Sequence, residues 1–189
     1  MDGERPALRE RLPDAAEVAP ALLAELSALA HAPRIVAIFR RADLPTGTDA
    51  AVGLALWHVA DPGNVGTLVR TADALGPAFV ALSPGCADPT SPKALRASAG
   101  AVFRVAVGRF QDVAGPRVAL AAKGGTALPE VELGDRVAFV LGAERDGLPD
   151  AVVAACDAVA TIPLAPSAES LNVAVAGAIA LYEWRRRTA

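Results

Sequence analysis

The side chains best suited to catalysis or ligand binding lie in three loops, each of which follows an apolar run. The first loop, residues 61–66, reads Asp-Pro-Gly-Asn-Val-Gly and leads into a helical pattern that carries Arg70 one turn in. Arg70 could hold a phosphate or a developing negative charge there, because a guanidinium stays protonated and donates several hydrogen bonds. The alternative is a simple turn, in which Asn64 caps the helix and Arg70 is a solvated surface residue.

The second loop, residues 141–149, contains two glycines on either side of Glu144. Gly142 and Gly147 allow the backbone to approach a ligand closely or to adopt a positive φ. The spacing matches neither the three-glycine dinucleotide fingerprint nor the phosphate-binding GxxxxGK[ST] loop. Glu144 is therefore either part of a ligand site of another kind or a cap of the following helix.

The third loop, residues 162–173, is rich in proline and small residues and ends where a long helical pattern begins. Ser170 suits the N-cap position of that helix. Asn172 would then fall in the first turn, where asparagine is a mediocre helix former. Its presence is easier to understand if its amide contacts a ligand, a loop or a nucleotide.

These loops are positioned by short apolar runs that alternate with helical stretches from residue 51 onward. We expect strands at 52–59, 78–82, 101–107, 118–122, 137–141 and 158–162, and helices at 66–75, 92–98, 149–156 and 171–187. Strands without inside–outside alternation, interleaved with helices, predict an α/β fold with a mainly parallel sheet flanked by helices. Ligands of such sheets bind beyond the carboxyl ends of the strands, where the loops after His58, Leu141 and Ile162 would lie.

The first fifty residues follow a different pattern. The apolar spacing of residues 15–30 predicts one helix, and residues 35–39 are a short strand candidate. Residues 40–49, which contain proline, glycine and two threonines, read as a linker.

Length, charge and composition narrow the class of protein. The chain has 189 residues, a net charge of −3 and 53% apolar residues, which predicts one main domain with a sizeable core. It opens without a signal-peptide pattern, and no run reaches the roughly 18 apolar residues of a membrane span. Cys86 and Cys156 form no CxxC pair, which indicates a reducing, cytoplasmic compartment. His31 and His58 have no partners at metal-ligand spacing, so no metal site is expected.

Taken together, the three loops resemble the three sequence motifs of the SpoU (TrmH-like) branch of the SPOUT RNA methyltransferases. The motifs are carried by DPGNVGTLVRTADALG, FVLGAERDGLP and TIPLAPSAESLNVAVAGAIALYEW. Between the first two, SPKALRASAGAVFRV is similar to a further family segment. Three motifs in order are far more specific than any one of them, and the resemblance covers residues 51–184.

The resemblance implies a particular fold and assembly. Residues 51–189 would form an α/β knot, in which the C-terminal segment threads through a loop to make a trefoil knot. Residues 1–50 would be a short region and linker, in which residues 34–40 look like the end of an RNA-binding domain similar to ribosomal protein L30e. The family is homodimeric, and the closing helix from Val173 to Tyr182 would supply part of the interface, with the partner subunit completing the site.

The function that the resemblance implies is methyl transfer from S-adenosylmethionine to a ribose 2′-hydroxyl of rRNA or tRNA. The residues that would hold the cofactor are Leu141, Gly142, Ile162, Leu164, Ser170 and Leu171. The catalytic residues would be Asn64, Arg70, Glu144, Ser170 and Asn172, among which Arg70 stabilises negative charge. The residues that would contact RNA on this mildly acidic protein form a local basic patch of Arg70, Lys93, Arg96 and Arg104.

The sequence departs from the family pattern at four positions. Arg145 and Pro166 stand where glycine is usual, Leu164 replaces a methionine and Ala174 replaces a serine. Two alternatives remain. One is a knotted dimer that binds RNA or the cofactor without turnover, and the other is an unrelated nucleotide-binding α/β enzyme. The second alternative is disfavoured because the phosphate-loop and dinucleotide patterns are missing.

Overall fold

The structure is a computed structural model that describes residues 9–27, 31 and 33–188, and the chain divides into two units, residues 1–39 and 40–189. In the first unit, helix α2 (Pro20–Leu26) is shorter than the predicted helix over 15–30, of which residues 28–30 lie outside the described residues. A proline at its first position sets the start of α2, because the ring fixes φ and lacks an N–H.

The strand expected at residues 35–39 is wrong. Residues 35–39 have no regular secondary structure, and Ile35, Val36 and Ile38 are exposed. An apolar run forms a strand only when a neighbouring strand accepts and donates its backbone hydrogen bonds, and the described residues provide none here.

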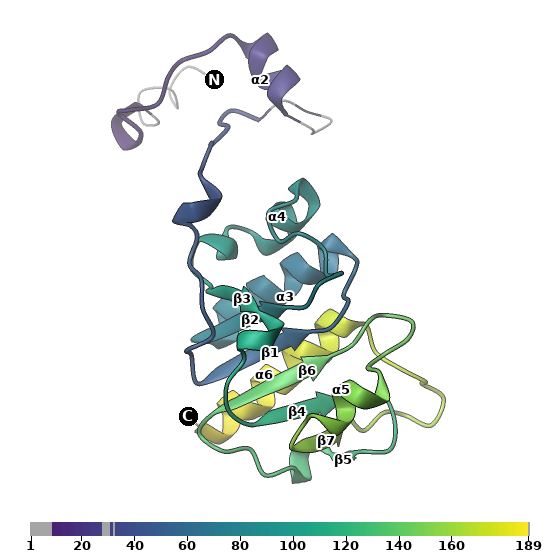
Figure 1. Cartoon of the computed structure of the whole chain (residues 1–189). Coiled ribbons are helices and arrows are strands. Elements are labelled where there is room, and N and C mark those ends of the chain that lie inside the picture. The colour runs from purple at the N-terminus through teal and green to yellow at the C-terminus, as the bar shows by residue number, and fades with distance from the viewer. Residues whose placement is uncertain (1–8, 28–30, 32, 189) are drawn as a thin grey trace. The chain divides into compact units, whose positions relative to one another are not determined.

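The second unit is built on a parallel sheet, as the sequence predicts (Figure 1). Its strands in the described part of the chain are β1 (Val52–Leu56), β2 (Ala78–Leu82), β3 (Val107–Arg109), β4 (Arg117–Leu120), β5 (Thr126–Ala127), β6 (Val137–Leu141) and β7 (Ala158–Thr161). Their order in the sheet is β3-β2-β1-β6-β4-β7-β5, and each neighbouring pair is parallel. The late strand β6 therefore lies between β1 and β4, and β7 lies between β4 and β5.

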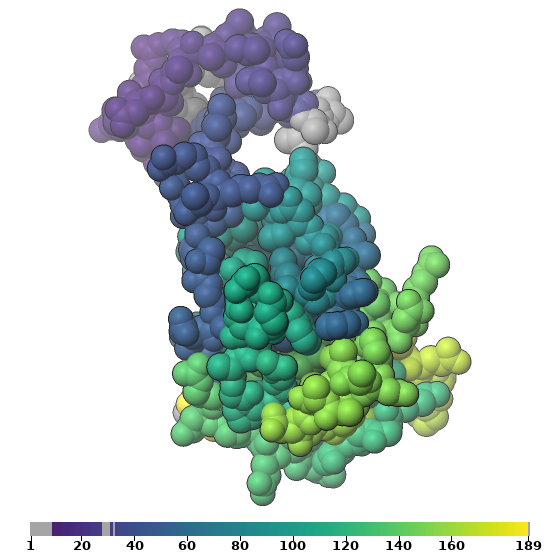
Figure 2. Space-filling model, in the orientation of Figure 1, coloured from purple at the N-terminus to yellow at the C-terminus, as the bar shows by residue number. Residues whose placement is uncertain are grey.

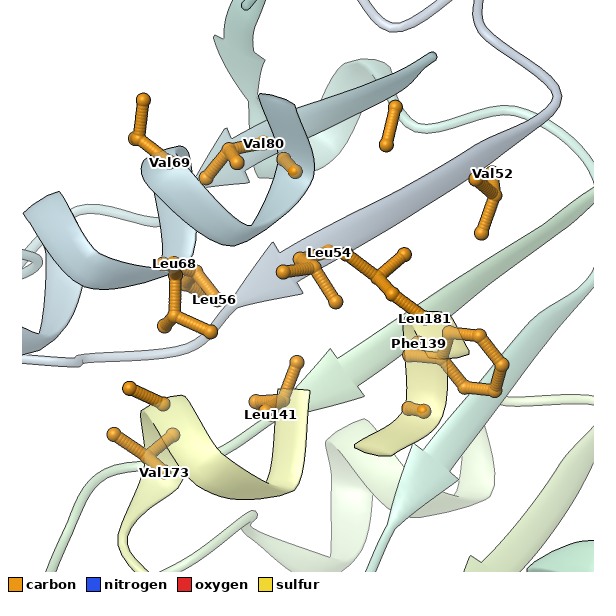
Figure 3. Close-up of a cluster of buried hydrophobic side chains, with 14 of the residues drawn as sticks. Val52, Leu54, Leu56, Leu68, Val69, Val80, Phe139, Leu141, Val173 and Leu181 are labelled. Carbon is orange, nitrogen blue, oxygen red and sulfur yellow. The ribbon is translucent and has the colours of Figure 1, made fainter. Parts of the chain in front are cut away.

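Helices cover both faces of this sheet. They are α3 (Pro62–Leu75), α4 (Pro92–Ser98), α5 (Asp150–Ala154) and α6 (Val173–Thr188). Helices α3 and α6 cover one face, where Leu54 of β1 and Phe139 of β6 share a buried cluster with Leu68 of α3 and Leu181 of α6 (Figure 3). The other face carries a smaller cluster, to which α5 contributes Val152, and α4 packs on α3. β1 and β6 are buried along their whole length, which confirms the expected two-sided cover.

Two predicted strands differ from the structure in an informative way. The run at 101–107 was expected to be a strand, but residues 101–103 form a 3₁₀ turn and β3 starts only at Val107. Ala101 and Val102 are buried on that turn, so tertiary packing overrides their strand propensity. The strand expected at 52–59 ends at Leu56 because His58 has a φ of +54°, which no regular strand allows.

The segment expected to be a linker, residues 40–49, belongs to the second unit. Thr46 forms a parallel bridge with Val107, and the buried Thr48 donates a hydrogen bond from its hydroxyl to the carbonyl of Asp112 at 3.0 Å. The compact unit therefore starts at Arg40, eleven residues before the boundary expected from the composition. None of the described helices is long and apolar enough to cross a membrane.

Candidate active site

The first loop connects β1 to α3, and Asp61 caps the helix. The Asp61 carboxylate accepts a hydrogen bond from the backbone N–H of Asn64 at 3.0 Å and one from Lys93 Nζ at 2.6 Å. The bond from Lys93, followed by the amide of Asn64, lowers the pKa of Asp61 below its ordinary value. The alternative in which Asn64 caps the helix is therefore wrong, and the Asn64 side chain is available for other contacts.

The second loop follows β6 and folds back on itself. Ala143 and Gly147 exchange backbone hydrogen bonds of 3.1 and 3.0 Å, and Gly147 has a φ of +65°. A Cβ atom on Gly142 would lie 2.2 Å from the carbonyl carbon of Gly147. Only glycine fits at position 142, since the neighbour is backbone that cannot rotate away. The turn places Glu144 and Arg145 at its tip.

Glu144 was expected either to belong to a ligand site or to cap the following helix, and it does not cap that helix. α5 starts after Pro149 and has no side-chain cap. Instead, Glu144 Oε1 accepts hydrogen bonds from Asn64 Nδ2 at 2.9 Å and from the backbone N–H of Asp61 at 3.4 Å. Burial alone would raise the pKa of Glu144, but the bonds from Asn64 and from the Asp61 and Ala60 amides outweigh it and lower that pKa. Glu144 is therefore an anion at neutral pH.

The third loop leads into α6, and Asn172 caps this helix. Its Oδ1 accepts hydrogen bonds from the N–H groups of Ala174 at 2.9 Å and Val175 at 3.4 Å. The prediction that Ser170 is the N-cap is wrong, because α6 starts at Val173. Asn172 is also turned toward the first loop, since its Nδ2 donates to Asn64 Oδ1 at 3.1 Å. Asn172, Asn64 and Glu144 thus form one chain of hydrogen bonds that joins all three loops.

Beside this chain of bonds lies a pocket of about 430 Å³. All six residues expected to hold a cofactor line it, namely Leu141, Gly142, Ile162, Leu164, Ser170 and Leu171. Glu144, Arg145 and Asn172 also line it, together with Ala121 and Ala122, which follow β4. The loop after β6 and the loop before α6 project from the same edge of the molecule in Figure 2, green and yellow. The sequence therefore located this pocket, although residues 121–122 were expected to be strand.

Two of the predicted catalytic residues, Asn64 and Arg70, do not line the pocket, and of these Arg70 has no hydrogen bond to the described residues that do. Arg70 lies on α3 with an exposed side chain, and no partner for its guanidinium is present in the described part of the chain. Of the other cations expected to contact RNA, Lys93 pairs with Asp61 and Arg104 pairs with Asp73, both at 2.6 Å. Arg96 has no such pair among residues 9–27, 31 and 33–188. Two of the four cations are therefore already neutralised.

A second hollow of about 490 Å³ runs between α3 and α6. Its lining is mostly apolar and consists of Asn64, Thr67, Thr71, Leu75, Asn172, Ala174, Val175, Ala178, Ile179 and Tyr182. Val175 and Tyr182 are 47% and 58% exposed, which is high for large apolar side chains on one helix. Asn64 and Asn172 line this groove, and Asn172 also lines the pocket, so the two hollows adjoin.

The sequence reasoning missed the functional position of two residues. Asp61 was part of a motif but had no role, although an aspartate directly before a proline is a common helix start. Arg145 was noted only as a departure from the family pattern, yet it lines the pocket as a cation without a partner in the described residues. In the same residues, no group of three or more His, Cys, Asp or Glu side chains could hold a metal ion.

A parallel α/β sheet with a pocket at the carboxyl ends of its strands defines a class of ligand-binding domain, in which cofactors bind at the edge loops. Comparison with known proteins identifies the family within this class. Residues 51–182 match the SpoU rRNA Methylase family, and the chain belongs to that family.

Similar proteins of known sequence or structure agree. The chain is 39% identical over 136 residues to the 23S rRNA (guanosine(2553)-2′-O)-methyltransferase RlmP of Bacillus subtilis. The aligned region covers 67% of the chain and 55% of RlmP. It is 36% identical over 148 residues to an uncharacterized tRNA/rRNA methyltransferase of Synechocystis, covering 73% of the chain and 54% of that protein. The chain thus spans about half the length of the curated relatives it matches.

Two solved structures resemble the chain closely enough to compare folds. The SpoU methyltransferase AviRb of Streptomyces viridochromogenes, in complex with AdoMet, has a TM-score of 0.76 and 28% identity, covering 95% of this chain and 77% of AviRb. An AdoMet-bound rRNA methyltransferase of Sinorhizobium meliloti has a TM-score of 0.69 and 34% identity, covering 78% of this chain and 60% of its own. Both support the parallel α/β fold described above.

Proposed function

We propose that this protein is an S-adenosylmethionine-dependent RNA methyltransferase that modifies a ribose 2′-hydroxyl of rRNA or tRNA. The observation that carries the proposal is the convergence of the three motif loops, of which the second and third line one pocket and the first is hydrogen-bonded to both. Asn64 is hydrogen-bonded to Glu144, which lies 80 positions later in the chain, and to Asn172, which lies 108 positions later. The family membership and the printed activity of RlmP point to the same reaction.

The pocket fits the proposed cofactor in size and chemistry. Its volume of about 430 Å³ lies in the range of small-molecule sites. Apolar side chains such as Leu141, Ile162 and Leu171 suit the adenine ring. Glu144 and Arg145 are of opposite charge and suit a zwitterionic amino-acid end. When bound, S-adenosylmethionine supplies an electrophilic methyl group, and the six residues named above would hold it.

In this mechanism Arg70 stabilises charge on the substrate. A 2′-hydroxyl becomes a good nucleophile only as its proton leaves, and a guanidinium beside it favours the developing oxyanion. Arg70 does not itself take the proton, because a guanidinium loses a proton only far above neutral pH. A substrate phosphate or water would accept it. Glu144, Asn64 and Asn172 hold the loops in register, and Ser170 faces the same pocket.

We further propose that the protein is a homodimer, with the partner seated on the groove between α3 and α6. The groove exposes Val175 and Tyr182, and burying such side chains stabilises an interface. Arg70 lies on the same helix as Thr67 and Thr71, which line the groove. A partner at the groove would therefore lie close to Arg70, in keeping with a site that both subunits complete.

The strand order favours the proposed trefoil knot. β6 and β7 enter the sheet between strands that precede them in the chain, as a threaded C-terminal segment requires. We propose that residues 51–189 carry the catalytic function, within the compact unit that starts at Arg40, and that residues 1–50 are accessory to it. Cys86 and Cys156 are both free thiols, which supports a reducing, cytoplasmic location.

The test combines calorimetry with a methyl-transfer assay. We expect S-adenosylmethionine to bind the wild-type protein, and tritium from the labelled cofactor to appear in total RNA from cells that lack this protein. Arg70→Ala should lower transfer at least 100-fold with the cofactor Kd changed less than twofold. The matched control is Arg136→Ala, because Arg136 directly precedes β6 and lies at the opposite end of the strand from the pocket. Near-normal transfer by Arg70→Ala would contradict the assigned role.

A further inference from the structure

The loop between β1 and α3 contains a residue in a strained conformation that the proposed mechanism does not use. His58 has a φ of +54°, in the left-handed region that disfavours side chains with a Cβ. Among the described residues the only other non-glycine with a positive φ is Ala99, at +48°. Strained residues that are held in place by their surroundings cluster at functional sites.

The surroundings hold the His58 ring firmly. Its imidazole stacks on the indole of Trp57 with ring centroids 4.9 Å apart and planes 8° from parallel, and Phe110 packs edge-on against Trp57. On Gly85, a Cβ atom would lie 3.4 to 3.5 Å from three atoms of the His58 ring. The backbone N–H of His58 donates to the buried hydroxyl of Ser83 at 3.0 Å. The ring is thus clamped, although the residue is exposed.

The ring edge of His58 is free to bind something else. Neither imidazole nitrogen has a hydrogen-bond partner in the portion of the chain that the structure describes. The position is also close to the candidate active site. Three residues further on, the backbone N–H of Asp61 donates to Glu144 Oε1 at 3.4 Å, and the N–H of Trp57 donates to the carbonyl of Leu141 at 2.8 Å.

We propose that His58 is a substrate contact, which donates a hydrogen bond from its imidazole to an oxygen atom of the RNA. The inference rests on the proposed function, since it takes RNA as the substrate. An imidazole N–H suits a phosphate oxygen or the carbonyl of a base. Clamping the ring in advance lowers the loss of side-chain entropy on binding. His58 then positions the RNA beside the pocket, and Trp57 serves as its support.

The decisive variant is His58→Gly, because glycine accepts the left-handed backbone and removes only the ring. We expect the KM for total RNA from cells that lack this protein to rise at least tenfold. The kcat and the Kd for S-adenosylmethionine should change less than twofold. Ala99→Gly is the matched control, since it relieves the same backbone strain at the end of α4 and removes no polar group. It should leave the KM for RNA unchanged.

Direct RNA binding separates this inference from the proposed function. The Kd for the same RNA, measured by filter binding at several salt concentrations, should rise in His58→Gly in parallel with KM. A salt dependence that also becomes shallower identifies a charged contact with a phosphate, and an unchanged one identifies an uncharged hydrogen bond to a phosphate or a base. A KM and a Kd within twofold of wild type would overturn the role of His58 while leaving the methyltransferase intact. Wild-type protein that binds RNA without transfer would overturn the proposed function alone, and wild-type protein without RNA affinity would overturn both.

Discussion

Replacing Asn64 by aspartate tests whether the chain of hydrogen bonds holds the three loops together. Asn64 donates to Glu144 through Nδ2 at 2.9 Å and accepts from Asn172 through Oδ1 at 3.1 Å. Asn64→Asp keeps the shape of the side chain and the acceptor toward Asn172. It exchanges the donor toward Glu144 for a second carboxylate oxygen, so that an attraction becomes a repulsion.

The magnitude follows from the distance. Two like charges 2.9 Å apart repel by about 1.4 kcal/mol with the dielectric constant of water and by about 6 kcal/mol at an effective value of 20. A lost hydrogen bond to a charged group adds about 1.5–3 kcal/mol. The total loss cannot exceed the free energy of protonating one of the two carboxylates, because protonation removes the repulsion. That free energy is about 1.4 kcal/mol for each pH unit above the pKa of the carboxyl group. With the reference pKa of about 4 for an aspartate side chain, that limit is about 4 kcal/mol at pH 7 and about 1.4 kcal/mol at pH 5.

The assay is chemical denaturation of wild type, Asn64→Asp and Asn64→Ala between pH 5 and pH 8. We expect Asn64→Asp to lose about 3–4 kcal/mol of unfolding free energy at pH 7 and to recover much of this at pH 5. Asn64→Ala removes the same bonds without adding a charge, so its loss should not depend on pH in this way. If Asn64→Asp matched Asn64→Ala at every pH, Glu144 would not be the anionic end of this chain and the reasoning would be refuted.

Two further predictions concern stability and the pocket. Glu183 is buried, and the hydrogen bond from Arg186, together with that from Arg187, lowers its pKa from 4.5 to about 2. This stabilisation is complete above about pH 4.5 and is lost as the pH falls toward 2. Glu183→Gln should therefore lower the free energy of unfolding by about 1–2 kcal/mol at pH 7. Near pH 2 the variant should be as stable as wild type. A difference that persists at pH 2 would contradict this assignment. Gly142→Ala should weaken binding of S-adenosylmethionine at least tenfold in calorimetry, since its Cβ meets the Gly147 backbone at 2.2 Å. Gly134→Ala, whose nearest neighbour would be 3.9 Å away, should bind as wild type does.

The sheet was largely predictable because its strands are buried on both faces. The runs at 78–82 and 137–141 are continuous apolar stretches between polar, proline or glycine residues, and both were predicted at their observed bounds. The segment at 101–107 shows where this signal fails. A short apolar run has the same composition in a buried 3₁₀ turn and in a strand, and only the helix packed against it decides between them.

The lining of the pocket was predictable, but the local roles of its polar residues were not. Capping was expected at Asn64 and Ser170 because these residue types favour that position. The structure places the caps at Asp61 and Asn172 instead. Which residue caps a helix depends on the single position at which the first helical turn begins. Sequence patterns define the ends of helices only to within one or two residues. Long-range hydrogen bonds, such as that between Asn64 and Asn172, leave no local pattern at all.

The direction of the hydrogen bonds explains why these positions carry two asparagines and a glutamate. Asn172 uses its oxygen to cap α6, so only its N–H₂ group remains, and this group must donate to Asn64. Asn64 therefore accepts through its oxygen and has only donors left for Glu144. The third residue must then offer an acceptor oxygen, which the Glu144 carboxylate does. The helix cap at one end thus fixes which group donates and which accepts along the whole chain of bonds, and the order of the α6 loop is coupled to that of the loop bearing Glu144 and Arg145.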